Sequence, residues 1–174
     1  MQTQIIKNQV KLDREIYNAN RIPRDEIAYG DEEKILDLAE KILERRVRHS
    51  DPLTSPVASK KYVSVLTRNH TVEVFGAIWL DTRHRVIEIE DLFTGTIDSA
   101  SVYPREIVKR ALTTNAAAAV FYHNHPSGEA VPSSSDIQIT KNIKQALQTI
   151  KVTVLDHLIA GRGETYSMAE NWQI

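Results

Sequence analysis

The chain has 174 residues, which suits one domain of ordinary size plus an N-terminal extension. Its content of 41% hydrophobic and 26% charged residues is typical of a globular protein, and the formal net charge of −1 provides no overall attraction for nucleic acid. The absence of cysteine excludes disulfides, thiolate metal ligands and a cysteine nucleophile.

Residues 1–50 are expected to form an N-terminal extension with one amphipathic helix. Residues 1–30 lack clear periodicity and contain no apolar stretch typical of a signal peptide. Over residues 31–48, apolar side chains recur at helical spacing. Three cations near the end of this segment suit the negative end of a helix dipole, namely Arg45, Arg46 and Arg48. No apolar run approaches the length of about 18 residues that a membrane-spanning helix needs, so we expect no membrane segment and a cytoplasmic location.

Residues 51–174 are expected to form one domain in which helices alternate with strands. Apolar residues repeat every 3.6 residues in a helix and every second residue in a strand, and this difference divides the segment into elements. Helices are predicted over residues 56–67, 101–115 and 133–150, and strands over residues 71–81, 86–93, 116–122, 152–160 and 165–168. The first helix is ambiguous, because Val63 and Val65 are β-branched and also favour a strand.

The order of these elements predicts the fold class. The first two strands resemble a hairpin, and the strand over residues 116–122 is apolar on both faces, as a covered central strand is. We therefore predict an α/β (α+β) fold, with a mixed central sheet flanked by helices.

The most informative run of the chain is His123-Asn124-His125-Pro126-Ser127-Gly128, followed by Ser133 and Asp136. On a strand, residues two apart point to the same side, so the two imidazoles can reach one metal ion. Asp136 is the natural third ligand, because it falls in the first turn of the next helix and Pro126 and Gly128 allow the loop to fold back. Two histidines and one aspartate suit a zinc ion and leave a fourth position for water, whose pKa then falls to about 7.

A hydrolytic zinc site also needs a proton acceptor, and glutamates upstream of the motif are the candidates. Glu73 is preferred, because it shares a strand face with Phe75 and other apolar residues, where a carboxylate is costly without a purpose or partner. Glu88 and Glu90 look instead like an ordinary solvated strand face. Ser133 is the candidate hydrogen-bond donor to the oxyanion of a tetrahedral intermediate.

Each part of this pattern also has a purely structural interpretation. Ser133 followed three residues later by Asp136 is typical of a helix start with a capping box. A His-x-His pair alone is more often incidental than a metal site, and Glu73 alone would suit an edge strand. His157, on the strand over residues 152–160, is interpreted first as a structural histidine, and support of a metal ligand is the alternative. The joint spacing of all the parts favours the metal site.

With these residues in place, the chain resembles the RadC family, a bacterial branch of the JAB/MPN (JAMM-motif) metal-dependent proteases. The family motif is an upstream Glu, then His-x-His-Pro-x-Gly, then Ser-x-x-Asp. Glu73 resembles the upstream glutamate and Ser133 the serine of this motif. The residues that match the zinc ligands are His123, His125 and Asp136. The similarity runs from about residue 54 to the C-terminus and includes Ser-Val-Tyr-Pro-Arg-Glu at 101–106 and Asp-His-Leu-Ile at 156–159.

The resemblance implies a JAB/MPN-like mixed sheet sandwiched by helices, with zinc at a strand end. It also implies peptidase or isopeptidase chemistry on a protein or peptide substrate, because relatives of this motif cleave amide bonds, including those to ubiquitin-like tails. Two other interpretations stay open: a DNA repair or recombination protein of the RadC type, with DNA as partner, and a non-catalytic binding module on the same fold. Only about fifty residues precede the matched part, without the helix-hairpin-helix glycine motif of full-length relatives, which weakens the DNA interpretation.

Overall fold

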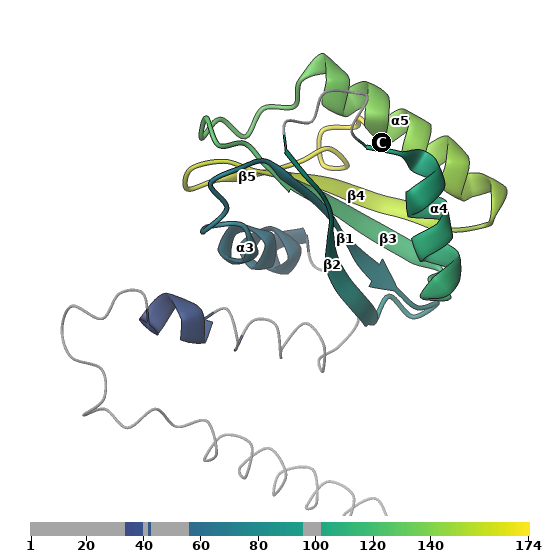
Figure 1. Ribbon diagram of the computed structural model, residues 1–174, viewed down its shortest axis with the longest axis horizontal. Coiled ribbons are helices and arrows are strands. Elements are labelled where there is room, and N and C mark those ends of the chain that lie inside the picture. The colour runs from purple at the N-terminus through teal and green to yellow at the C-terminus, as the bar shows by residue number, and fades with distance from the viewer. Residues whose placement is uncertain (1–33, 40–41, 43–55, 96–101) are drawn as a thin grey trace, which may run out of the picture. The chain divides into compact units, whose positions relative to one another are not determined.

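The computed structural model describes residues 34–39, 42, 56–95 and 102–174 (Figure 1). Of the predicted N-terminal helix, residues 34–39 and 42 are helical, and the rest of that prediction lies outside the described residues. The predicted domain boundary at residue 50 and the three arginines at 45, 46 and 48 also lie outside them. Among the described residues, no helix combines the length and apolar character needed to cross a membrane.

Five strands form one mixed sheet in the order β2-β1-β3-β4-β5. They are β1 (Val74–Leu80), β2 (Val86–Thr94), β3 (Ala118–Asn124), β4 (Thr153–Ala160) and β5 (Thr165–Ser167). β1 is antiparallel to both β2 and β3, β3 is parallel to β4, and β4 is antiparallel to β5. The predicted hairpin and mixed sheet are confirmed.

Three helices cover the two faces of this sheet (Figure 1). They are α3 (Pro56–Leu66), α4 (Pro104–Thr113) and α5 (Ser134–Thr149). α4 and α5 lie on one face, and α3 lies on the other. α5 connects β3 to β4, which is the crossover that a parallel pair of strands requires.

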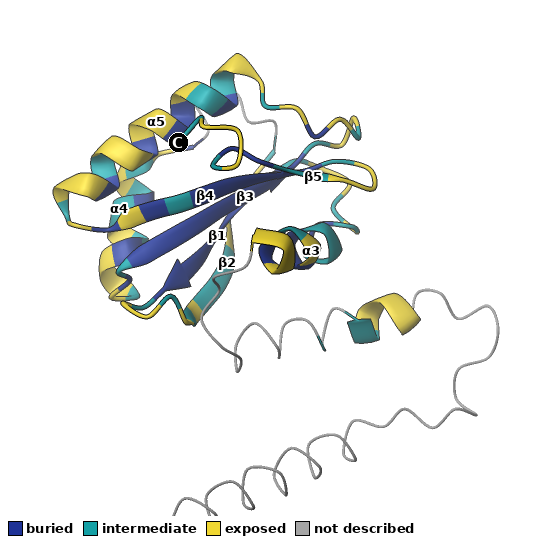
Figure 2. Ribbon diagram, turned by 180° about the vertical axis from the view of Figure 1, so that it is seen from behind, coloured by how far each residue is buried: buried dark blue, intermediate teal, exposed yellow. Residues whose placement is uncertain are grey.

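The two core layers follow from the alternation of side chains along β1. Phe75 and Trp79 pack with Phe121 and the helices α4 and α5 on one face. Ile78 and Leu80 pack against α3 on the other. All residues of β1 and β3 are buried, which Figure 2 shows as dark blue central strands between helices with exposed outer faces. The prediction of a covered central strand is therefore confirmed.

The structure settles the ambiguity over residues 56–67 in favour of a helix. Ser59, Tyr62 and Val63 are buried on one side of α3, which is the i, i+3, i+4 pattern of an amphipathic helix. The β-branched residues in this segment therefore did not indicate a strand. Packing against the sheet outweighs their intrinsic preference.

Candidate metal centre

The His-x-His motif lies where β3 ends and its chain turns away. His123 is the second-to-last residue of β3, and its side chain is fully buried. The side chain of His125, just beyond the strand, is 15% exposed. The backbone N–H of His125 donates to the carbonyl of Ala160 at 2.9 Å, which keeps this segment beside β4. Gly128 adopts a φ of +92° in the loop that follows, a conformation that glycine tolerates best. The predicted fold-back of this loop is confirmed.

Asp136 reaches the two histidines from the first turn of α5. Ser133 is the N-cap of this helix, and its hydroxyl accepts from the backbone N–H of Asp136 at 3.1 Å. In return, the Asp136 carboxylate accepts from the Ser133 backbone N–H at 2.7 Å and from its hydroxyl at 2.6 Å. The predicted capping box is therefore present, and the same interactions orient Asp136 toward the histidines.

The three predicted ligand side chains converge at distances that suit a small cation. The Nε2 atoms of His123 and His125 are 3.0 Å apart. Nε2 of His123 lies 3.5 Å from Oδ1 of Asp136, and Nε2 of His125 lies 3.5 Å from Oδ2 of the same carboxylate. A tetrahedral zinc ion with bonds of about 2.0–2.1 Å separates its ligand atoms by about 3.3–3.4 Å. The donor set and its spacing therefore fit zinc.

Glu73 lies beside this group, at the more exposed side. Its carboxylate is 4.0 Å from Nε2 of His125, and one ligand atom from each of the four side chains lies within 4.8 Å of the others. The prediction that Glu73 is part of the strand is wrong, because β1 begins at Val74. Glu88 and Glu90, the alternative glutamates, instead bind Arg110 of α4.

A chain of buried hydrogen bonds supports His123 from behind. Nδ1 of His123 is 2.8 Å from Nε2 of His157, and Nδ1 of His157 is 2.6 Å from the hydroxyl of Thr140. That hydroxyl donates to the carbonyl of Asp136 at 2.5 Å. Since a carbonyl only accepts, the Thr140 proton is committed there, and His157 must donate through Nδ1. Nε2 of His157 then accepts from Nδ1–H of His123.

This assignment leaves Nε2 of His123 without a proton, so its lone pair is directed toward Asp136 and His125. His125 is held in the same tautomer by a different partner, because its Nδ1 is 2.8 Å from the carbonyl of Glu129. Ligand histidines in metal proteins are commonly fixed in this way by a bond from the second ring nitrogen. Of the two interpretations of His157, the structure favours support of a ligand. Thr140 was not identified from the sequence.

The electrostatics of the group separate the two histidines. Burial lowers the pKa of His123 to about 4, so this imidazole is neutral near pH 7. The hydrogen bond that protonated His125 donates to the Asp136 carboxylate is the main cause that raises the pKa of His125. Burial alone would raise the pKa of Asp136, but the interactions with His125, His123 and Ser133 lower it below its usual value. Binding of a divalent cation requires unprotonated ligands, and the neutral His123 and the ionised Asp136 meet this requirement near pH 7.

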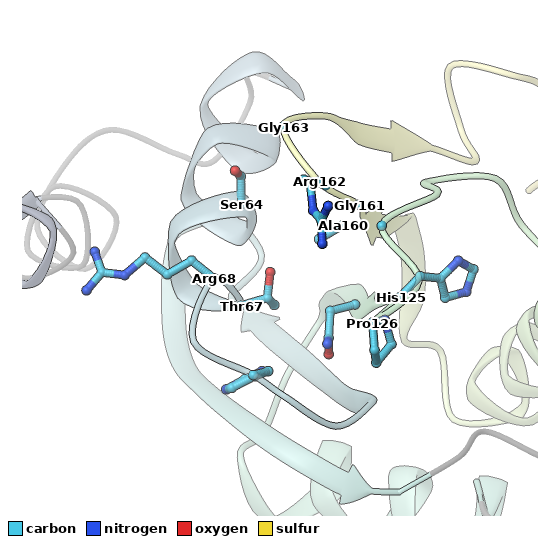
Figure 3. Close-up of a pocket in the computed structure, with 12 residues that line it drawn as sticks. Ser64, Thr67, Arg68, His125, Pro126, Ala160, Gly161, Arg162 and Gly163 are labelled. Carbon is cyan, nitrogen blue, oxygen red and sulfur yellow. The ribbon is translucent and has the colours of Figure 1, made fainter. Parts of the chain in front are cut away.

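A cavity of about 360 Å³ lies on the α3 side of this strand end (Figure 3). Ser64, Thr67 and Arg162 are among its lining residues, together with Asn124, which alternates with the two histidines. His125 also belongs to the wall, but Figure 3 shows its ring directed away from the α3 residues. The candidate metal ligands and this cavity therefore lie on opposite sides of the end of β3.

Fold and site together define a mixed-sheet α+β domain with a candidate metal centre at the end of its central strand. The family model for the RadC-like JAB domain matches residues 53–173. The chain belongs to this family.

Curated relatives support the same assignment. The chain is 44% identical over 142 residues to a UPF0758 protein of Marinobacter nauticus, which covers 82% of this chain and 63% of that protein. It is 51% identical over 136 residues to one of Stutzerimonas stutzeri, covering 78% and 61%. It is 42% identical over 165 residues to one of Halorhodospira halophila, covering 95% and 73%. The chain thus spans less than two thirds of the length of the first two, and the shared name states no activity.

Proposed function

We propose that the chain is a zinc-dependent hydrolase of amide bonds, a metallopeptidase or isopeptidase. The observation that carries this proposal is the convergence of His123, His125 and Asp136, whose donor atoms lie 3.0–3.5 Å apart, with the Glu73 carboxylate beside them. These three side chains would hold the ion. Zinc bound there would activate a water near neutral pH and polarise the carbonyl of the substrate. The choice of an amide bond follows from the resemblance to the JAB/MPN proteases.

Glu73 is assigned the proton transfers of this reaction. Its carboxylate accepts a proton from the attacking water and returns it to the nitrogen of the leaving amine, so no net charge accumulates. Its side chain is 16% exposed and that of His125 is 15% exposed, whereas those of His123 and Asp136 are nearly or fully buried. A substrate would therefore approach from the side of Glu73 and His125.

Ser133 has a narrower assignment than the sequence suggested. Its hydroxyl proton is donated to Asp136, so its observed contribution is to orient a ligand. Donation to a substrate oxyanion requires that proton to leave the carboxylate. Ser133 remains the candidate for that step, because its hydroxyl is bonded directly to the side-chain carboxylate of the proposed ligand Asp136.

The test is cleavage of a peptide library by the zinc-loaded chain and by Glu73→Gln. An enzyme should lose turnover by about 10²- to 10⁴-fold in this variant while its zinc content stays the same. Glu164→Gln, at an exposed position after β4, is the matched control and should cleave like the unaltered chain. Equal cleavage by Glu73→Gln, or no cleavage by the unaltered chain, would contradict the proposal and favour a binding module.

A further inference from the structure

We propose that Asn124, the residue between the two histidines, is a positioning residue that fixes Glu73 beside the candidate metal ligands. The catalytic part of this inference rests on the proposed function. The structural part does not, because it concerns where the backbone around Glu73 is held. The evidence is a set of hydrogen bonds at the point where β1 and β3 separate.

The backbone pairing of β1 with β3 ends at Phe75 and His123. Beyond this pair, the backbone of β3 turns toward β4, where His125 donates to Ala160. The β1–β3 ladder therefore stops at Phe75, two residues before Glu73. The side chain of Asn124 takes the place of the missing backbone partner.

Both ends of the Asn124 amide bind the chain around Glu73. Its Oδ1 accepts from the backbone N–H of Val74 at 2.9 Å, and its Nδ2 donates to the carbonyl of Val72 at 3.0 Å. On the other side, the carbonyl of Glu73 itself accepts from the N–H of Gly95 at 2.8 Å. Three consecutive residues are thus fixed through their backbones, and Glu73 is the central one.

An asparagine is suited to this place for chemical reasons. The two hydrogen bonds from Asn124 to Val72 and Val74, called the clamp below, need one donor and one acceptor on a short side chain. An amide group supplies both. Asn124 is only 5% exposed and Val74 only 4%, so a residue that leaves the Val74 N–H unbonded would incur the cost of a buried polar group. Alternation along the strand then explains the whole tripeptide: His123 and His125 face the metal group, and Asn124 faces the opposite side and holds the glutamate.

The first experiment measures backbone amide hydrogen exchange in the full chain, for Asn124→Ala and the unaltered protein. Loss of the Asn124 side chain should speed exchange at Val74 and at Gly95 by about tenfold or more. The Val74 amide donates to Asn124 itself, and the Gly95 amide donates to the carbonyl of Glu73, the residue that Asn124 holds in place. Tyr122→Phe is the matched control: it lies on β3 on the same side as Asn124 and loses a part-buried hydrogen bond to Asp91, a residue outside the segment 72–74 that Asn124 holds. Unchanged exchange in Asn124→Ala would overturn the proposal, whether or not any peptide is cleaved.

The second experiment is a double-mutant cycle with Glu73→Gln. If Asn124 acts through Glu73, Asn124→Ala should lower kcat by about 10- to 100-fold in the unaltered background and leave the residual rate of Glu73→Gln unchanged. Zinc affinity should stay the same, because the three ligands are untouched. An equal loss in both backgrounds, or a loss of zinc affinity, would contradict a positioning role.

The two proposals fail in distinguishable ways. Absence of cleavage by the unaltered, zinc-loaded chain would overturn the hydrolase, while faster exchange at Val74 and Gly95 would still support the clamp. If Asn124→Ala does not fold, Asn124→Ser replaces it, since a serine hydroxyl is too short to bridge both backbone groups.

Discussion

His123 donates from Nδ1 to Nε2 of His157 over 2.8 Å, and both rings are buried. A neutral imidazole therefore occupies the place behind a candidate metal ligand where, in known metal sites, a carboxylate or a carbonyl is more usual. Burial lowers the pKa of His157 well below its ordinary value, which keeps this ring neutral and able to accept. The tautomer of His157 depends in turn on the hydroxyl of Thr140.

Thr140→Val should therefore weaken zinc binding. The isopropyl group preserves the shape but removes the acceptor for Nδ1–H of His157, so that ring no longer has a fixed tautomer. We expect zinc affinity to fall by about 10- to 100-fold, measured by competition with a chelator of known affinity. Thr140→Ser keeps the hydroxyl and should stay close to the unaltered chain. Equal zinc affinities for the valine and serine variants would show that the hydrogen bonds from Thr140 through His157 do not affect His123.

Ser133→Ala should lower the stability of the metal-free protein. It removes the N-cap of α5 and one hydrogen bond to the Asp136 carboxylate. The expected decrease in the free energy of unfolding is about 1 kcal/mol, measured by urea denaturation at neutral pH. Ser134→Ala, at the exposed next position, is the control and should change stability little. A loss of stability no larger in Ser133→Ala than in Ser134→Ala would show that the capping box contributes nothing.

Zinc affinity should increase with pH, because the ion must displace the proton of His125. The hydrogen bond with Asp136 raises the pKa of His125 above 6.5, whereas burial lowers that of His123 to about 4. Below the raised pKa, the metal-free protein holds one proton that zinc expels, and affinity should rise about tenfold per pH unit. Above it, affinity should become constant.

Calorimetry in buffers of different ionisation enthalpy checks this prediction by counting released protons. Between pH 5 and the raised pKa of His125, zinc should release up to one proton per ion, since His123 is already neutral in that range. Release of two protons in that range, or an affinity that does not rise with pH there, would contradict the assignment of the two histidines.

The sequence predicted those parts of the site that depend on local geometry. His123 and His125 share a side because of strand periodicity, and Asp136 follows from a capping box that its own segment encodes. Glu73 was also identified, as a carboxylate in an apolar pattern, although the strand begins one residue later than its position.

The residues behind the site depend on pairing between distant segments, so local patterns left the role of His157 open and did not indicate those of Thr140 and Asn124. His157 reaches His123 because β3 and β4 pair in parallel, with Phe121 opposite His157 and a register shift between Ala119 and Val120. No local pattern reports that register. Asn124 is similar, because its contacts with Val72 and Val74 arise only where β1 and β3 diverge. The motif His-Asn-His shows that Asn124 lies between the two histidines, but it does not indicate which backbone groups the asparagine binds.

The most direct test of the metal centre is an equilibrium zinc titration of the metal-free chain. The geometry predicts one zinc ion per chain, with binding lost in His123→Ala and in Asp136→Ala and retained in Glu73→Gln. Tight stoichiometric binding that survives both ligand substitutions, or no binding by the unaltered chain, would contradict the assignment of these side chains as a metal site.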